Sequence, residues 1–491
     1  MVFTIFRGRT VAIIVVVAMI FSSLGTVLVV GDGGLLDQWK AGALFSSDLA
    51  RQEAAFDAHS DKLKQAFAFI KANYVHNVSD QKLIDGAISG MVNSLGDPFS
   101  TYMSPDQASQ FQEDLKSKFT GIGAEVTMKN GRLTIVSPIK GSPAEKAGLR
   151  PEDQVIKVNG QSLEGMDINE AVGKIRGPKG TKAVLDIMRP GVHDLIHITV
   201  VRDEIAMETV EGKILQDRIG RITINQFSED TAKEFHKTLA GLEKQGMKGL
   251  IIDVRGNPGG ILPVVLDILD ELVPHHSVVL MTEDRNGNKT KFTSKLDQPK
   301  PYPIAVLIDG GSASASEILA AGLKESAGAT LIGERSYGKG TVQTTQDFKD
   351  GSNIKMTIAK WLTPKGNWID QHGGSKGIQP DVPVSLPDYA QAIPPQPSKP
   401  LKRDDNSGDV KNMQMILDAL GYNPGRQDGY FDGRTEQAVR EFQETKNLPV
   451  TGQFDRKTAD QLRSAFIDFL QDPKNDVPLQ VAIEWMKKKM K

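Results

Sequence analysis

Residues 310–318 read Gly-Gly-Ser-Ala-Ser-Ala-Ser-Glu-Ile and follow PIAVLID at 303–309. The apolar run at 303–309 predicts a short buried strand, and EILAAGLK at 317–324 predicts an amphipathic helix. The three serines therefore belong to a strand-turn-helix corner. Small residues at such a corner let a substrate backbone approach, and the first N–H groups of the helix favour an oxyanion. A serine that only caps the helix is the simpler interpretation of the corner alone.

A second segment, Gly338-Lys339-Gly340-Thr341-Val342-Gln343, offers a base. If a helical turn follows Lys339, Gln343 shares its face at i, i+4 spacing and can orient the ammonium stem. A lysine acts as a general base only when burial lowers its pKa toward neutrality. A Ser-Lys pair is a known variant of the Ser-His-Asp arrangement. The residues alone do not decide which of the three serines would take part.

Four segments in this order resemble the carboxy-terminal processing proteases: DVRGNPGGIL at 253–262, GSASASEILA at 311–320, GERSYGKGTVQ at 333–343 and GIQPDVPV at 377–384. These are Ser-Lys endopeptidases that carry an embedded PDZ domain and work outside the cytoplasm. The resemblance runs from about residue 67 to about residue 384. It implies that Ser314 is the nucleophile, Lys339 the base and Gln343 its support, with Tyr337 where the family usually has Phe.

The chemistry implied by this resemblance is acyl transfer, whose tetrahedral oxyanion needs two N–H donors. The backbone of Ala315, the residue after the nucleophile, is the expected first donor. The second is expected from Gly259 or Gly260, because LIIDV at 250–254 predicts a buried strand that ends in a turn with exposed N–H groups. An ordinary Pro-Gly turn is the alternative for that segment.

Ser336 and Lys339 also spell S-x-x-K, the nucleophile motif of penicillin-recognising acyl enzymes. Glycines flank the lysine here, and neither S-D-N nor K-T-G occurs in the chain, so this interpretation is disfavoured. The chain has no cysteine, which excludes disulfides and thiol catalysis, and its net charge of −2 argues against a nucleic-acid partner. We expect neither a metal nor a cofactor.

Residues 119–190 resemble a PDZ domain. Gly121, Ile122, Gly123 and Ala124 match the loop whose N–H groups take a peptide's terminal carboxylate, and the next strand would pair with that peptide. Arg176 is a candidate contact between the PDZ domain and the protease, or else a solvated loop charge. Protein substrates with accessible C-terminal tails are the expected partners, and tail binding would shift the population of active enzyme.

The N-terminus contains 21 uncharged residues, Thr10 to Val30, preceded by Arg7 and Arg9. This length predicts a single-pass membrane anchor within residues 1–31, with the catalytic part outside the cytoplasm. A signal peptide cleaved near Ala41-Gly42-Ala43 is the alternative. After a spacer at 32–60, the pattern at 61–118 predicts helices. The family resemblance adds dimerisation there, so a homodimer is expected.

The expected fold class is therefore a multidomain α/β protein with an N-terminal transmembrane helix, a helical segment, a PDZ domain, an α/β serine protease core and a small all-α domain. The core is expected at 191–388 and a linker rich in Pro and charge at 389–408. Residues 409–466 resemble the peptidoglycan-binding domain of cell-wall enzymes, and a tail helix follows at 467–491. The expected function is a serine endopeptidase. The alternatives are an inactive PDZ and wall-binding scaffold, or acyl transfer on wall peptides through Ser336.

Overall fold

The computed structural model describes residues 45–116, 118–129, 131–139, 141–190, 192, 194–274, 276–370 and 377–490. The chain divides into two compact units after Gly90, and each is described by itself. The first unit contains helix α2 (Phe45–Asn73) and most of α3 (Asp80–Asn93). Helix α2 begins within the segment that the sequence analysis assigned to a spacer at 32–60.

The expected fold class is wrong in one part. Over the described residues, the structure contains no helix with both the length and the apolar character that a bilayer crossing needs. The longest described helix, α2, carries charged residues along its whole length. The apolar stretch Thr10 to Val30 lies outside the described residues. The fold class is corrected to a multidomain α/β protein with a PDZ domain, a protease core and a C-terminal all-helical domain.

A six-stranded sheet forms the centre of the second unit, in the order β10-β11-β12-β15-β16-β19. β10 pairs antiparallel with β11 and the other pairs are parallel. Every residue of the two central strands is buried, as is typical of parallel strands covered on both faces. The strands span Val210–Ile214, Ile219–Ile224, Gly249–Asp253, Ile304–Ile308, Thr330–Gly333 and Val382–Pro383.

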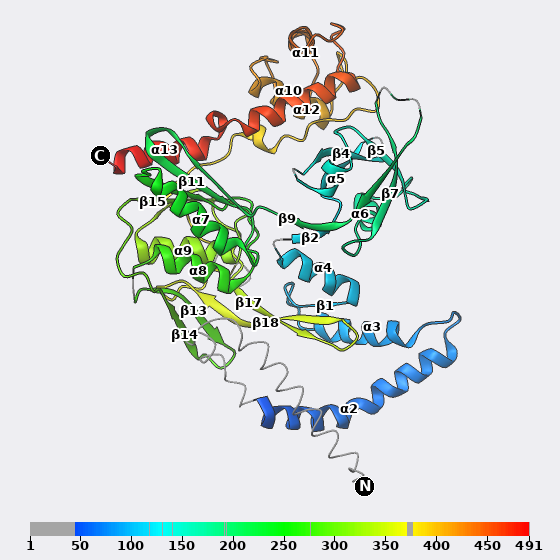
Figure 1. The fold of residues 1–491 in the computed structure, drawn as a ribbon, viewed down its shortest axis with the longest axis vertical. Coiled ribbons are helices and arrows are strands. Elements are labelled where there is room, and N and C mark those ends of the chain that lie inside the picture. Colours follow the sequence, from blue (N-terminus) through cyan, green and yellow to red (C-terminus); the bar gives the residue numbers. More distant parts are fainter. Residues whose placement is uncertain are drawn as a thin grey trace. The chain divides into compact units, whose positions relative to one another are not determined.

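Helices cover both faces of this sheet (Figure 1). On one face lie α7 (Thr231–Lys244), α8 (Leu262–Leu272) and α9 (Ala315–Ala327), which share the main apolar core with the sheet. On the other face lies α13 (Val477–Lys489), the last helix of the chain. Gly328 follows α9 as its C-cap, and its φ of +70° is the left-handed conformation common after a helix.

A second, antiparallel sheet carries the segment that follows Lys339. Its order is β1-β18-β13-β14, and β17 pairs with β18. These strands span Thr101–Met103, Thr341–Asp347, Asn353–Leu362, Val278–Asp284 and Lys289–Thr293 for β1, β17, β18, β13 and β14. Gln343 is therefore on a strand, and the helical turn that would place Gln343 on the same face as Lys339 does not form.

The PDZ-like region forms a sheet in the order β3-β4-β5-β7-β8, with the short β6 beside β5. These strands span Ala124–Lys129, Arg132–Pro138, Gln154–Val158, Lys182–Met188, Ile196–Val201 and, for β6, Gln161–Ser162. Two helices, α5 (Pro143–Lys146) and α6 (Ile168–Ile175), complete it. Helix α4 (Pro105–Leu115) precedes it, and the ribbon of β2 (Lys118–Gly121) and β9 (Asp203–Ala206) closes it.

The C-terminal domain is helical and has its own apolar core. It contains α10 (Gly408–Ala419), α11 (Gly433–Thr445) and α12 (Arg456–Gln471), as is expected of an all-α domain. After α12 the chain returns to the protease sheet as α13. The residues Leu479, Ala482, Ile483 and Met486 of α13 pack on Ile219, Ile251, Ala305, Leu307 and Ile332. The final helix is thus part of the core of the protease sheet.

Candidate active site

The three serines of the corner have different surroundings. Ser312 and Ser316 are fully buried, and their hydroxyls donate to the carbonyls of Val254 at 2.8 Å and Asn257 at 2.9 Å. Ser314 is half-buried at the N-cap of α9. Its φ of +54° and ψ of −113° are a conformation that a non-glycine residue adopts only at an energetic cost. Burial thus separates Ser314 from its neighbours, which the sequence does not.

Lys339 is fixed next to the same corner. The N–H groups of Ser314 and Lys339 both donate at 2.9 Å to one carboxylate oxygen, Oε2 of Glu317. The structure therefore brings the two segments together at a residue that the sequence analysis did not single out. The S-x-x-E spacing of Ser314 and Glu317 is a capping-box signature and could have indicated it.

The ammonium of Lys339 is half-buried against an aromatic ring, with Nζ 5.0 Å from the ring centre of Phe99. Burial lowers the pKa of Lys339, and the nearby charge of Lys355 lowers it further. Glu317 and Asp97 act in the opposite direction. The lowered pKa favours the neutral amine, the form that can accept a proton.

Gln343 lies on β17, and its amide donates to the hydroxyls of Thr341 at 2.9 Å and Thr357 at 3.3 Å. These bonds hold its side chain between β17 and β18. In the part of the chain that the structure describes, these two threonines are the hydrogen-bond partners of the Gln343 amide.

The glycine turn after β12 lies against the corner. A Cβ at Gly259 would be 2.8 Å from Cβ of Ser314 and 3.0 Å from the nitrogen of Ala315. The N–H of Gly259 donates to Oδ1 of Asn257 at 2.8 Å and is therefore occupied. Gly260 is exposed, and its N–H has no hydrogen bond among the described residues. Of the two glycines, Gly260 is the better donor for an oxyanion.

Ser336, the alternative nucleophile, is buried inside the protein. Its hydroxyl donates to Oε1 of Glu317 at 2.5 Å and accepts the N–H of Ile378 at 2.7 Å. Both functions of this hydroxyl are used in the fold, and a substrate carbonyl has no access to it. This arrangement disfavours the S-x-x-K interpretation.

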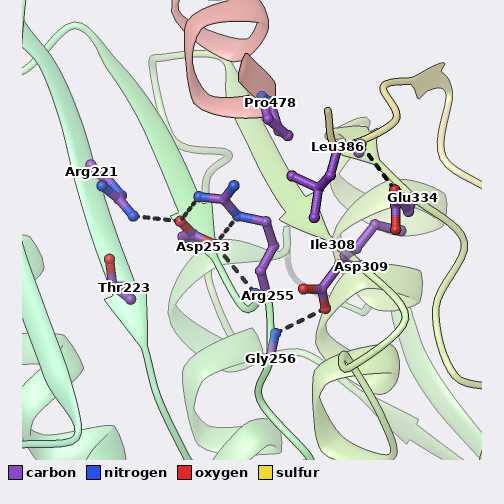
Figure 2. A pocket seen from close by; sticks show the side chains of 11 residues that line it. Arg221, Thr223, Asp253, Arg255, Gly256, Ile308, Asp309, Glu334, Leu386 and Pro478 are labelled. Atoms are coloured by element: carbon purple, nitrogen blue, oxygen red, sulfur yellow. Dashed lines mark hydrogen bonds and ion pairs between the residues drawn. The ribbon is translucent and has the colours of Figure 1, made fainter. Parts of the chain in front are cut away.

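A hollow of about 280 Å³ lies at the carboxyl edge of the central strands, beside α13 (Figure 2). Asp253 there binds the guanidinium groups of Arg221 and Arg255 at 2.6 Å and 2.7 Å, and Arg255 also binds Asp476 at 2.7 Å. None of the site residues predicted from the sequence lines this hollow. It is lined by Arg221, Thr223, Asp253, Arg255, Gly256, Ile308, Asp309, Gly333, Glu334, Leu386 and Pro478.

The predicted carboxylate loop of the PDZ region connects β2 to β3. Gly121 ends β2, and Gly123 has a φ of +75° while its carbonyl accepts bonds from the hydroxyl of Ser142 and the N–H of Ile139. Ile122 is buried, and Ala124 begins β3, an edge strand of its sheet.

Arg176 lies beside this loop. Its Cγ is 3.9 Å from a Cβ placed on Gly121, and its guanidinium stacks 5.5 Å from the ring centre of Phe119. The same guanidinium approaches Glu113 of α4 at 3.7 Å. Arg176 is thus a neighbour of the predicted carboxylate loop.

Comparisons with known families match four parts of the chain. Residues 218–384 match peptidase family S41, and residues 134–189 match the PDZ domain. Residues 406–462 match a peptidoglycan binding domain, and residues 36–107 match the N-terminal domain of the activating protease CtpB.

Full-length relatives show the same relationship. Carboxy-terminal processing protease CtpB of Bacillus subtilis is 44% identical over 479 residues, which cover 97% of this chain and 98% of the relative. CtpA of the same organism is 42% identical over 97% of this chain and 98% of the relative. A probable CtpA-like serine protease of Staphylococcus aureus is 36% identical over 84% of this chain and 82% of its own length. The chain therefore belongs to the carboxy-terminal processing serine proteases of peptidase family S41.

Proposed function

We propose that the protein is a Ser-Lys endopeptidase in which Ser314 is the nucleophile and Lys339 the general base. The observation that carries this proposal is the pairing of the two segments on Oε2 of Glu317, which joins the half-buried Ser314 to a lysine whose pKa burial lowers. The hydroxyls of the two other serines of the corner donate hydrogen bonds to backbone carbonyls.

In the first step, neutral Lys339 takes the proton of Ser314 while Oγ attacks the peptide carbonyl. The charged lysine then protonates the leaving amine, and an acyl-enzyme remains on Ser314. Water, deprotonated by the same lysine, hydrolyses the ester and restores the serine. The amide of Gln343 donates to Thr341 on β17 and to Thr357 on β18. By linking these two strands it supports the segment that carries Lys339.

The oxyanion of the tetrahedral intermediate would accept the N–H groups of Ala315 and Gly260. Ala315 is the first residue of α9, where the helix dipole also favours negative charge. The N–H of neither residue has a partner among the described residues. Because Gly259 has no side chain, its backbone can lie close to Ser314 and Ala315.

Gly259→Ala is expected to lower kcat/KM by about a hundredfold, since its Cβ would displace Ser314 from its attacking position. Initial rates on a fluorogenic peptide measure this loss. The matched control is Gly256→Ala in the same turn. It also has a positive φ, +67°, yet no heavy atom lies within 4 Å of the new Cβ. Equal losses in the two variants would contradict the steric role of Gly259.

The PDZ domain would recognise the C-terminal tails of protein substrates. The β2 to β3 loop would receive the tail carboxylate, and the tail would extend the sheet along β3, whose outer edge is unpaired in the described sheet. Arg176 is positioned beside the loop, where it could sense the occupied site.

The peptidoglycan binding match supports a role at the cell wall, and thus outside the cytoplasm. A homodimer is supported by large apolar side chains that are exposed in the N-terminal helical unit. These include Leu63, Phe69, Ile70 and Ile84. A second copy of the chain is the partner that this proposal assigns to them.

Casein digestion by residues 41–491 tests the proposed nucleophile. Wild type is expected to cleave, with or without an added tail peptide, and Ser314→Ala is expected to lose cleavage. Ser336→Ala is expected to lose only part of the activity. The loss arises because the Ser336 hydroxyl donates a hydrogen bond to Glu317. Loss in Ser336→Ala with full activity in Ser314→Ala would move the nucleophile to Ser336. No cleavage by wild type under either condition would favour the scaffold alternative.

A further inference from the structure

Glu317 is a carboxylate buried at the junction of the two catalytic segments. Its side chain is completely inaccessible to solvent and accepts four hydrogen bonds. Oε1 accepts the hydroxyl of Ser336 at 2.5 Å and the N–H of Gly338 at 2.7 Å. Oε2 accepts the N–H groups of Ser314 and Lys339, both at 2.9 Å. The carboxylate as a whole is thus bound by donors from two separate parts of the chain.

Helix capping explains only one of these bonds. In a capping box, the glutamate three residues after the N-cap binds the N-cap N–H, as Glu317 does with Ser314. The other three donors come from residues 336–339, about twenty positions further along the chain. An exposed carboxylate would suffice for a capping box. The burial of Glu317 and its three further partners point to a second role.

The hydrogen-bond pattern fits an ionised carboxylate. All four partners are donors, and an ionised carboxylate offers only acceptors. Burial raises the pKa of Glu317 above its ordinary value, and the donors from Ser336, Lys339, Gly338 and Ser314 oppose this shift by favouring the charged form. A buried charge is tolerated only when it is satisfied in this way. The site therefore holds a negative charge beside the lysine.

This charge acts on Lys339. The other groups that face the lysine are Lys355 on β18, Asp97 and the ring of Phe99, both of which precede β1. Burial and Lys355 favour the neutral amine, and the carboxylates of Glu317 and Asp97 favour the ammonium. The protonated lysine formed after proton transfer from the serine is stabilised by the same carboxylates.

We propose that Glu317 is the positioning residue of the dyad: its carboxylate fixes the backbones of Ser314 and Lys339 to one point and stabilises the ammonium that forms during the reaction. This inference rests on the Ser-Lys reaction proposed above. Because the attacking distance is set by both backbones, a shift at Glu317 changes the position of nucleophile and base together. Misplacement of reacting groups by about 1 Å can cost about a hundredfold in rate.

Glu317→Gln tests this role. The substitution replaces one carboxylate oxygen, which accepts hydrogen bonds, by an NH₂ group, which donates them. At either position this NH₂ group would face two N–H or O–H donors. We expect kcat to fall by about a hundredfold with a much smaller change in KM. The acid limb of the pH profile should move to lower pH, because the charge that raises the pKa of Lys339 is gone. The control, Glu229→Gln, removes the same charge from a residue on the surface of the protease domain.

Two further measurements keep the proposal falsifiable. Glu317→Asp keeps the charge but shortens the side chain, so kcat should fall while the acid limb stays in place. If Glu317→Gln does not fold, wild-type kcat in Glu317→Asp overturns the proposal. A loss of melting temperature with no movement of the acid limb in Glu317→Gln would also overturn it, because helix capping alone predicts that result.

A direct measurement separates this inference from the proposed function. In a Ser314→Ala background, the pH dependence of Lys339 acetylation by limiting acetic anhydride reports the pKa of the lysine without any proteolysis. Adding Glu317→Gln should move that dependence to lower pH. An unchanged curve contradicts the inference about Glu317. Wild-type cleavage that persists in Ser314→Ala contradicts the proposed dyad instead.

Discussion

Lys339→Ala is expected to lower kcat/KM for casein or a tail-bearing reporter by a factor on the order of 10⁴ to 10⁶. Without the amine, the hydroxyl of Ser314 keeps its proton and the leaving amine receives none. Ser314→Ala is expected to show a loss of similar size. The double variant should be no worse than either single variant, because residues that act as one unit do not give additive losses.

The comparison needs a lysine outside the site and a test of folding. Lys349→Ala removes the same side chain from the exposed turn between β17 and β18 and should leave cleavage intact. Thermal unfolding of each variant should stay close to that of wild type. Additive losses in the double variant, or rapid turnover by Lys339→Ala, would show that the two residues do not form a catalytic unit.

Ile483→Asp is expected to lower the free energy of unfolding by about 4 kcal/mol or more, from the lost apolar packing and the unpaired buried charge. Ile483 is 3% exposed and packs with Leu479 and Met486 of α13 on the second face of the central sheet. Such a loss is a large part of the stability of an ordinary domain. Denaturant unfolding followed by circular dichroism measures it.

Lys488→Asp places the same residue five positions further along α13, on its exposed side. Its effect on the free energy of unfolding should stay below about 1 kcal/mol, since surface substitutions in a helix are usually tolerated. If both variants unfold at the wild-type denaturant concentration, α13 does not stabilise the core.

The secondary structure of the core was largely predictable from local pattern. The apolar runs at 250–254 and 303–309 are strands, and the run at 262–272 is α8, because continuous apolar segments bounded by Gly and Pro leave few alternatives. The conformation of the segment after Lys339 was not predictable in this way. The i, i+4 spacing of Lys339 and Gln343 fits a helical face, but pairing with β18 made the segment a strand, and such tertiary pairing is not visible locally.

The details of the site depend on burial, which a single sequence does not show. Nothing in Gly-Ser-Ala-Ser-Ala-Ser distinguishes Ser314 from Ser312 and Ser316. The difference lies in carbonyls of Val254 and Asn257, about 60 residues earlier in the chain. The occupied N–H of Gly259 is equally hidden, because it depends on how the side chain of Asn257 turns back. The role of Glu317 requires the segment 336–339 to fold over α9.

The position of α13 sets the order in which the molecule can be completed. The central sheet is assembled from strands that end at Pro383, yet one of its faces is covered by the last helix of the chain. The segment between Pro383 and α13 includes the region at 406–462 that matches a peptidoglycan binding domain. At about 5–20 residues per second, the ribosome needs several seconds or more to synthesise it. Until α13 has been synthesised, the apolar residues on that face of the sheet lack the helix that buries them.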